Sequence, residues 1–150
     1  MQILITLALL LVGVVAGASA VVQQVVIAGL RASIGSASWA VLISYIGGTI
    51  GTALVVLAMR EPMIGLQTMA KTPLLFWFAG LFGVVYIFLA ILLIPKLGSA
   101  TTIAVLIAGQ LIASVVFDHF GLFGLPQHPV DIQRVAGAVA LLAGVMLIRS

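Results

Sequence analysis

The sequence predicts an all-α integral membrane protein with five transmembrane helices, and three observations carry this prediction. Apolar residues make up 64% of the 150-residue chain and charged residues only 6%, which is too little charge for a soluble surface. The apolar residues form long runs, and crossing a hydrocarbon core takes about 20 mainly apolar residues as a helix. Polarity does not alternate along the runs as it does in the strands of a membrane barrel. We therefore expect a single membrane domain over residues 1–150.

Five apolar runs are each long enough to span the membrane. Roughly five crossings fit in a chain of this length. We expect helices over approximately residues 3–26, 39–59, 73–94, 99–117 and 132–148. Turn residues and charges mark the connectors, which begin at Arg31, Arg60, Pro95 and Asp118. Backbone amides in lipid must be satisfied within their own segment, so these runs are predicted to be helices rather than buried strands.

The first run contains the tripeptide Ala18-Ser19-Ala20, which is similar to a signal peptidase site. However, no Lys or Arg precedes its apolar core, and the run continues past Ala20 to Arg31. We therefore expect a retained helix, and cleavage would leave four spans.

Cationic residues divide evenly between the two membrane faces that five spans create. The side of the amino terminus holds Arg60, Lys71 and Arg134, and the other side holds Arg31, Lys96 and Arg149. Cytoplasmic loops normally carry the excess of Lys and Arg, so this balance leaves the direction of insertion unfixed. We hypothesise that the chain inserts both ways and that opposite copies pair as an antiparallel dimer. The alternative is a weak bias resolved by the free amino terminus or by a partner protein.

Small residues recur one turn apart along the predicted helices, and helices in lipid associate through close packing of such residues. The predicted packing positions are Gly13 and Gly17, Gly47 and Gly51, Gly80 and Gly83, and Gly109, together with Ala136, Ala140 and Gly144. Pairs of this kind are common in membrane helices and identify no function.

Polar residues inside the spans should face protein or water, because an unpartnered amide in hydrocarbon costs several kcal/mol. The fourth run places Thr102, Gln110 and Ser114 on one face, and the first run does the same with Ser19 and Gln23. Together with the phenol of Tyr86, these residues are candidates for lining a weakly polar substrate cavity near the membrane centre. The alternative is hydrogen bonding between helices without a ligand.

No Asp, Glu or His lies in the centre of any predicted span. Asp118 and His119 lie just after the fourth run, and Glu61 lies just after the second. Asp118 is a candidate gate or coupling residue, or else an acid that binds loop amides beyond the helix end. His119 suits a helix carboxyl end, where positive charge is favoured.

The sequence contains no recognisable motif for catalysis or for cofactor binding. The sequence shows no metal-ligand cluster, no nucleophile with a base at plausible spacing and no phosphate-binding glycine loop, so we expect neither an enzyme nor a cofactor. A net charge of +3 without a basic block predicts no nucleic-acid partner. The absence of cysteine excludes disulfides and thiolate metal sites.

Four stretches carry a family resemblance along nearly the whole chain. They are LGSATTIAVLIAGQLIASVVFDHFG, GLFGVVYIFLAILLIPKLG, VVQ at Gln23 and GAVALLAGVMLI. The chain resembles the YdcZ-type small inner-membrane exporters, half-size relatives within the drug/metabolite transporter superfamily. The positions carried over by motif are Gln23, Gly80, Gly83, Gln110 and Asp118. Many members have an asparagine shortly after the first-helix glutamine, where this chain has Ile27.

The resemblance implies a five-helix half-transporter of bacterial inner membranes whose full-length relatives fuse two halves as inverted repeats. It also implies oppositely oriented pairs or single chains of dual topology. We therefore expect a small-molecule exporter that works by alternating access as an antiparallel homodimer in the lipid bilayer. The substrate is expected to be neutral, amphipathic or a delocalised cation, because no Lys or Arg lies inside a span. The alternatives are a subunit of a heteromeric transporter and a membrane scaffold that transports nothing.

Overall fold

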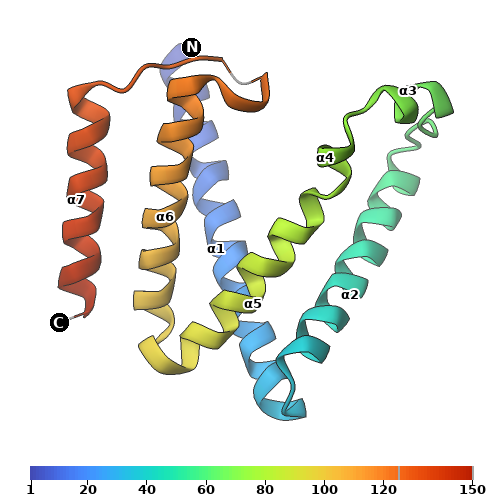
Figure 1. Ribbon diagram of the computed structural model, residues 1–150, viewed down its shortest axis with the longest axis horizontal. Helices are drawn as coiled ribbons and strands as arrows, with labels where there is room; N and C mark the ends of the chain where they lie inside the picture. Colours follow the sequence, from blue (N-terminus) through green and yellow to red (C-terminus); the bar gives the residue numbers. More distant parts are fainter. Residues whose placement is uncertain (125, 150) are drawn as a thin grey trace. The chain divides into compact units, whose positions relative to one another are not determined.

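The computed structural model describes residues 1–124 and 126–149, and within these ranges the chain is helical and contains no strand (Figure 1). In chain order the elements are α1 Gln2–Ile34, α2 Ala37–Ala58, α3 Leu66–Lys71, α4 Leu74–Trp77, α5 Ala79–Leu97, α6 Ser99–Phe120, the 3-10 turn η1 Leu122–Gly124, and α7 Ile132–Arg149. By length and composition α1, α2, α5 and α6 are able to cross a membrane, and α7 is a shorter apolar helix. The all-α membrane class is thus confirmed, with four candidate spans and one shorter apolar helix.

Two compact units divide the chain, Met1–Leu92 and Leu93–Ser150, and the boundary falls within α5. In the first unit, α1 and α2 lie closest near their connection and diverge away from it (Figure 1). Buried Ile27 from α1, Ala40 and Val41 from α2, and Ile87 and Ile91 from α5 form the apolar core of this unit. Ile27, where the sequence departs from the pattern that the resemblance implies, is therefore a core residue here.

The first helix ends at Ile34 rather than near residue 26 as the sequence predicted. Arg31 was assigned to the connector, but it lies in the last turn of α1, where its Nη1 donates to the carbonyl oxygen of Ile91 at 2.8 Å. The helix stops at Gly35, whose φ of 71° is the left-handed conformation that glycine adopts freely. Its N–H donates to the carbonyl of Arg31, and Ser36 then caps α2 by accepting from the Trp39 N–H.

The third expected span, 73–94, is interrupted and then extended. It is interrupted at Phe78, where the N–H bonds to the carbonyl of Leu75 and so tightens the chain to an i to i+3 turn between α4 and α5. It is extended because α5 runs through Pro95 to Leu97. Proline has no N–H for the carbonyl four residues earlier, which is that of Ile91. Arg31 supplies the missing donor, and the helix continues past Pro95 to Leu97.

The second unit is built on α6 and α7, which pack against each other. Gly121, with φ 59°, ends α6 in the left-handed conformation, and Asp131 caps α7 by accepting from the Arg134 N–H at 2.8 Å. Most large apolar side chains of both units are exposed, including those along residues 2–19 of α1. This exposure fits helices whose apolar surface meets lipid or another protein chain.

Candidate functional site

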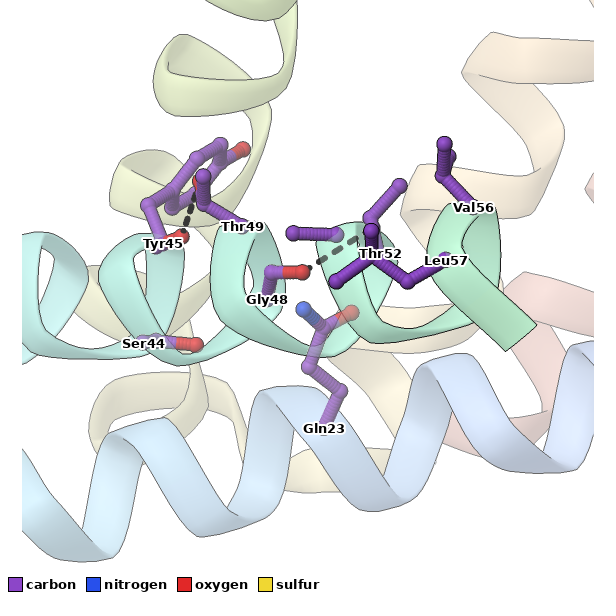
Figure 2. Close-up of a pocket in the computed structure, with 9 residues that line it drawn as sticks. Gln23, Ser44, Tyr45, Gly48, Thr49, Thr52, Val56 and Leu57 are labelled. Atoms are coloured by element: carbon purple, nitrogen blue, oxygen red, sulfur yellow. Dashed lines mark hydrogen bonds between the residues drawn. The ribbon is translucent and has the colours of Figure 1, made fainter. Parts of the chain in front are cut away.

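A groove of about 770 Å³ lies between α1 and α2 in the first unit. Gln23 contributes its amide from α1, and Figure 2 shows this side chain pointing toward α2. The other lining residues all come from α2 and are Ser44, Tyr45, Gly48, Thr49, Thr52, Ala53, Val56 and Leu57. Its polar lining residues are uncharged, and the rest of the lining is apolar.

Hydroxyl groups of α2 in this groove are held by their own helix. Thr49 Oγ1 donates to the carbonyl of Tyr45 at 2.8 Å, and Thr52 Oγ1 donates to the carbonyl of Gly48 at 2.9 Å (Figure 2). Each hydroxyl therefore donates its hydrogen bond to the backbone, and the lone pairs of its oxygen remain available as acceptors. The side chains of Gln23 and Ser44 make no hydrogen bond within the described chain, so their side-chain donors and acceptors remain available to a ligand.

The groove suits a weakly polar ligand. A site of this kind combines an apolar lining with a few placed polar groups, which orient the ligand without demanding a charge. Because no lining residue is ionisable at neutral pH, an anion would find no cation to pair with it.

The sequence analysis assigned Gln23 and Tyr86 to one cavity, but their side chains lie in different surroundings in the first unit. Gln23 is exposed in the groove, whereas the Tyr86 hydroxyl accepts from Nε2 of Gln24 at 3.0 Å. Gln24, which the sequence analysis did not select, is 2% exposed. Ser19 lies exposed on α1, one turn before Gln23.

The predicted polar face of α6 is only partly buried. Thr102 is fully buried and donates to the carbonyl of Gly98 at 2.8 Å, as expected for a hydroxyl satisfied by its own helix. Gln110 is exposed, and Ser114 is exposed beside the facing helix α7. A contact between Gln110 and a ligand stays a prediction.

A smaller cavity of about 240 Å³ lies between α6 and α7 and contains an ion pair. Ser114 and Asp118 line it from α6, and Arg134 lines it from α7. Arg134 Nη1 donates to Asp118 Oδ2 at 3.1 Å, with about a third of each side chain exposed. The carboxylate of Asp118 therefore binds a guanidinium rather than the loop amides considered in the sequence analysis.

The loop after α6 folds back onto the end of that helix. The His128 N–H donates to the carbonyl of Asp118 at 2.8 Å, and Gln127 Nε2 donates to the carbonyl of His119 at 2.9 Å. The Val130 N–H donates to Nδ1 of His119 at 3.1 Å. His119 thus holds the loop through Nδ1, which accepts from the Val130 N–H.

Among the predicted packing glycines, Gly83 makes the close contact. A Cβ at this position would lie 2.6 Å from the hydroxyl oxygen of Tyr45, so a larger residue would require the Tyr45 side chain to shift. A Cβ at the other seven would meet nothing within 4 Å; these are Gly13, Gly17, Gly47, Gly51, Gly80, Gly109 and Gly144. These glycines therefore make no close helix contact within their own unit.

The polar side of α2 was missed by the sequence analysis, although the sequence carries a signal for it. Ser44, Gly48 and Thr52 follow at four-residue spacing, as do Tyr45 and Thr49. This is the same periodicity that selected the polar face of the fourth run. The sequence analysis used only Gly47 and Gly51 of this helix, which lie on a neighbouring face and were assigned to packing.

Comparison with known proteins shows the family to which this chain belongs. Residues 8–147 match the family described as "Putative inner membrane exporter, YdcZ". The chain is also similar to inner membrane protein YdcZ of Escherichia coli (strain K12), with 38% identity over 69 residues. That alignment covers 46% of this chain and 46% of the relative, so it spans about half the length of each. No solved structure matches the chain.

Proposed function

Because this chain belongs to the YdcZ family of inner-membrane exporters, we propose that it moves a small molecule across the bacterial inner membrane as an antiparallel homodimer. The family resemblance noted in the sequence is confirmed, and the description of that family supports a membrane transporter. Substrate, orientation and mechanism belong to the proposal.

The groove between α1 and α2 is the single observation that carries the proposed substrate site. Its uncharged polar groups lie on two helices able to cross a membrane, with Gln23 opposite Ser44 and Thr52. A ligand that is neutral, amphipathic or a delocalised cation can use these groups without a buried counter-charge. An anion is disfavoured for the same reason.

The antiparallel arrangement is supported by the even division of cations, which counts α7 as the fifth span, and by the exposed apolar surfaces of the helices. A twofold axis in the membrane plane would present each groove twice, once in each orientation. A shape open to one side in one subunit would become open to the other when the two subunits exchange shapes. Alternating access then needs only one kind of subunit. A subunit of a heteromeric transporter is instead expected to carry more Lys and Arg on one membrane face than on the other.

Gln110 enters the proposal as a second polar group facing the shared pathway. It is exposed on α6, and within the described chain its amide has no partner. Replacing Gln110 by Leu is expected to abolish transport and leave the dimer intact. Loss of the dimer instead would assign Gln110 to packing.

Complementation between oriented copies tests the proposed function. Lysines added to the Arg60–Lys71 connector bias one copy, and lysines added beside Lys96 bias the other. Efflux of ethidium, a delocalised cation, and of a panel of neutral solutes is then measured in cells, with an anionic dye as the negative control. Each biased copy alone should be inactive, and the two together should recover efflux. Full activity from one biased copy would refute the antiparallel dimer, and no flux of any probe from the unmodified chain would favour a scaffold.

A further inference from the structure

Gln24 is buried in the first unit with half of its amide unsatisfied. Its side chain is 2% exposed, and its Nε2 donates to the hydroxyl oxygen of Tyr86 at 3.0 Å. Its Oε1 is buried as well, and no group of the described chain donates to it. Buried carbonyl oxygens are rarely left without a donor, so this atom points to a missing partner.

Tyr86 offers the complementary open group. A phenol hydroxyl both accepts and donates, and here its oxygen accepts from Gln24. Its proton finds no acceptor among the residues that the structure describes. The two side chains therefore present one free acceptor and one free donor at the two ends of a single hydrogen bond.

The surroundings of the pair are apolar and uncharged. Ile27 follows Gln24 by about one turn on α1, Ala90 follows Tyr86 by one turn on α5, and both are buried. The next cation along α1 is Arg31, whose guanidinium already donates to the Ile91 carbonyl. A charged group placed at the pair would have no counter-charge, which selects a neutral ligand.

We propose that Gln24 and Tyr86 form a binding site for a neutral hydroxyl group. The hydroxyl donates to Oε1 of Gln24 and accepts from the Tyr86 O–H, which closes a ring of three hydrogen bonds with the existing one. Such a ring satisfies both open groups at once, and hydrogen bonds in a chain polarise one another. An ether accepts without donating and leaves Oε1 open, while an ammonium donates without accepting and brings a charge.

This site is separate from the groove and depends on neither a second copy nor transport. Gln23 points into the groove, whereas Gln24 is turned by about 100° around the helix and meets α5. Because Oε1 is closed off in this structure, the proposed site requires α1 and α5 to separate before a hydroxyl reaches it. Water and a membrane-soluble alcohol carry the same hydroxyl chemistry, and the experiment distinguishes them.

Nuclear magnetic resonance of the Gln24 side-chain amide in the full chain, reconstituted in lipid nanodiscs, tests the site. The Gln24→Leu variant assigns the signal. The probes are 1-butanol and its isomer methyl propyl ether, which has the same formula and no O–H donor. Cross-relaxation with water, measured without additive, reports whether water occupies the site. Gln23→Leu is the matched control for butanol binding, because the neighbouring glutamine faces the groove.

We expect 1-butanol to shift the Gln24 signal saturably in the wild type and in Gln23→Leu, and the ether to leave it unchanged. Tyr86→Phe keeps the ring and removes the hydroxyl, so it should weaken butanol binding by roughly tenfold. A water cross-peak without a butanol shift would support the hydroxyl site with water as its occupant. Equal shifts from butanol and ether, or no water contact together with no butanol shift, would overturn the proposal.

Discussion

The guanidinium of Arg31 donates to the carbonyl oxygen of Ile91 at 2.8 Å, and this carbonyl is the acceptor that Pro95 leaves open. One contact thus joins the last turn of α1 to α5 and allows α5 to continue through a proline. A hydrogen bond from a charged donor contributes about 1.5–3 kcal/mol when its partner is otherwise unsatisfied.

A double-mutant cycle on Arg31 and Pro95 tests this coupling. Pro95→Ala restores an N–H for the Ile91 carbonyl, so Arg31 becomes partly redundant. We expect Arg31→Met to lower the unfolding free energy by about 2 kcal/mol in the wild type and by less than half of that in Pro95→Ala. Unfolding in micelles followed by circular dichroism gives both values. Equal losses in the two backgrounds would show that the contact does not serve the proline site.

Gly83 is predicted to be intolerant of a methyl group because of Tyr45. A Cβ at Gly83 would lie 2.6 Å from the Tyr45 hydroxyl oxygen, so Gly83→Ala should destabilise the first unit by about 1–3 kcal/mol. Adding Tyr45→Phe removes the hydroxyl and should restore most of the loss. Gly29→Ala is the control, since nothing lies within 4 Å of its Cβ position. If Tyr45→Phe gave no rescue, the hydroxyl would not be the obstacle.

The polar groups of the groove are predicted to act on transport rather than on stability. Gln23 is exposed and has no partner in the described chain, so Gln23→Leu should leave the unfolding temperature nearly unchanged. Flux of the best probe should fall by about tenfold, because each lost ligand hydrogen bond weakens binding by up to that factor. Gln67→Leu in α3 is the matched control. Normal flux with Gln23→Leu would remove the groove from the transport pathway.

Asp118 and Arg134 lie at helix ends where each charge opposes the helix dipole, an acid at the end of α6 and a base at the start of α7. Their pairing offsets this, but partial exposure keeps the contribution of the pair to about 0.2–1 kcal/mol. The exchange Asp118→Arg with Arg134→Asp keeps the charge of this connector and suits both dipoles. We expect stability at or above the wild type.

Transport by the exchanged pair decides whether Asp118 is a gate. If the carboxylate itself controls the pathway, flux falls in the exchanged protein although its unfolding temperature is preserved. Unchanged flux would leave the pair with a structural role. Asp118→Asn tests the carboxylate alone, because it removes the negative charge of residue 118 and keeps the positive charge of Arg134.

Periodicity and composition were enough to predict the helices, but not which residue of a pair faces which neighbour. Gln23 and Gln24 are adjacent and chemically identical, so a helical pattern cannot choose between them. The choice depends on where α2 and α5 lie around α1. Similarly, Arg31 was assigned to a connector because charges normally end spans, and only its contact with the Ile91 carbonyl explains why α1 continues to Ile34.

Orientation of the carboxyl terminus tests the antiparallel dimer most directly. Two fusions at the carboxyl terminus are compared, one to alkaline phosphatase, which is active outside the inner membrane, and one to green fluorescent protein, which fluoresces inside. With cations divided evenly, we expect both fusions to give strong signals, and Arg134→Gln to shift their ratio. A signal from only one fusion in the unmodified chain would place every copy in a single orientation and contradict the antiparallel dimer.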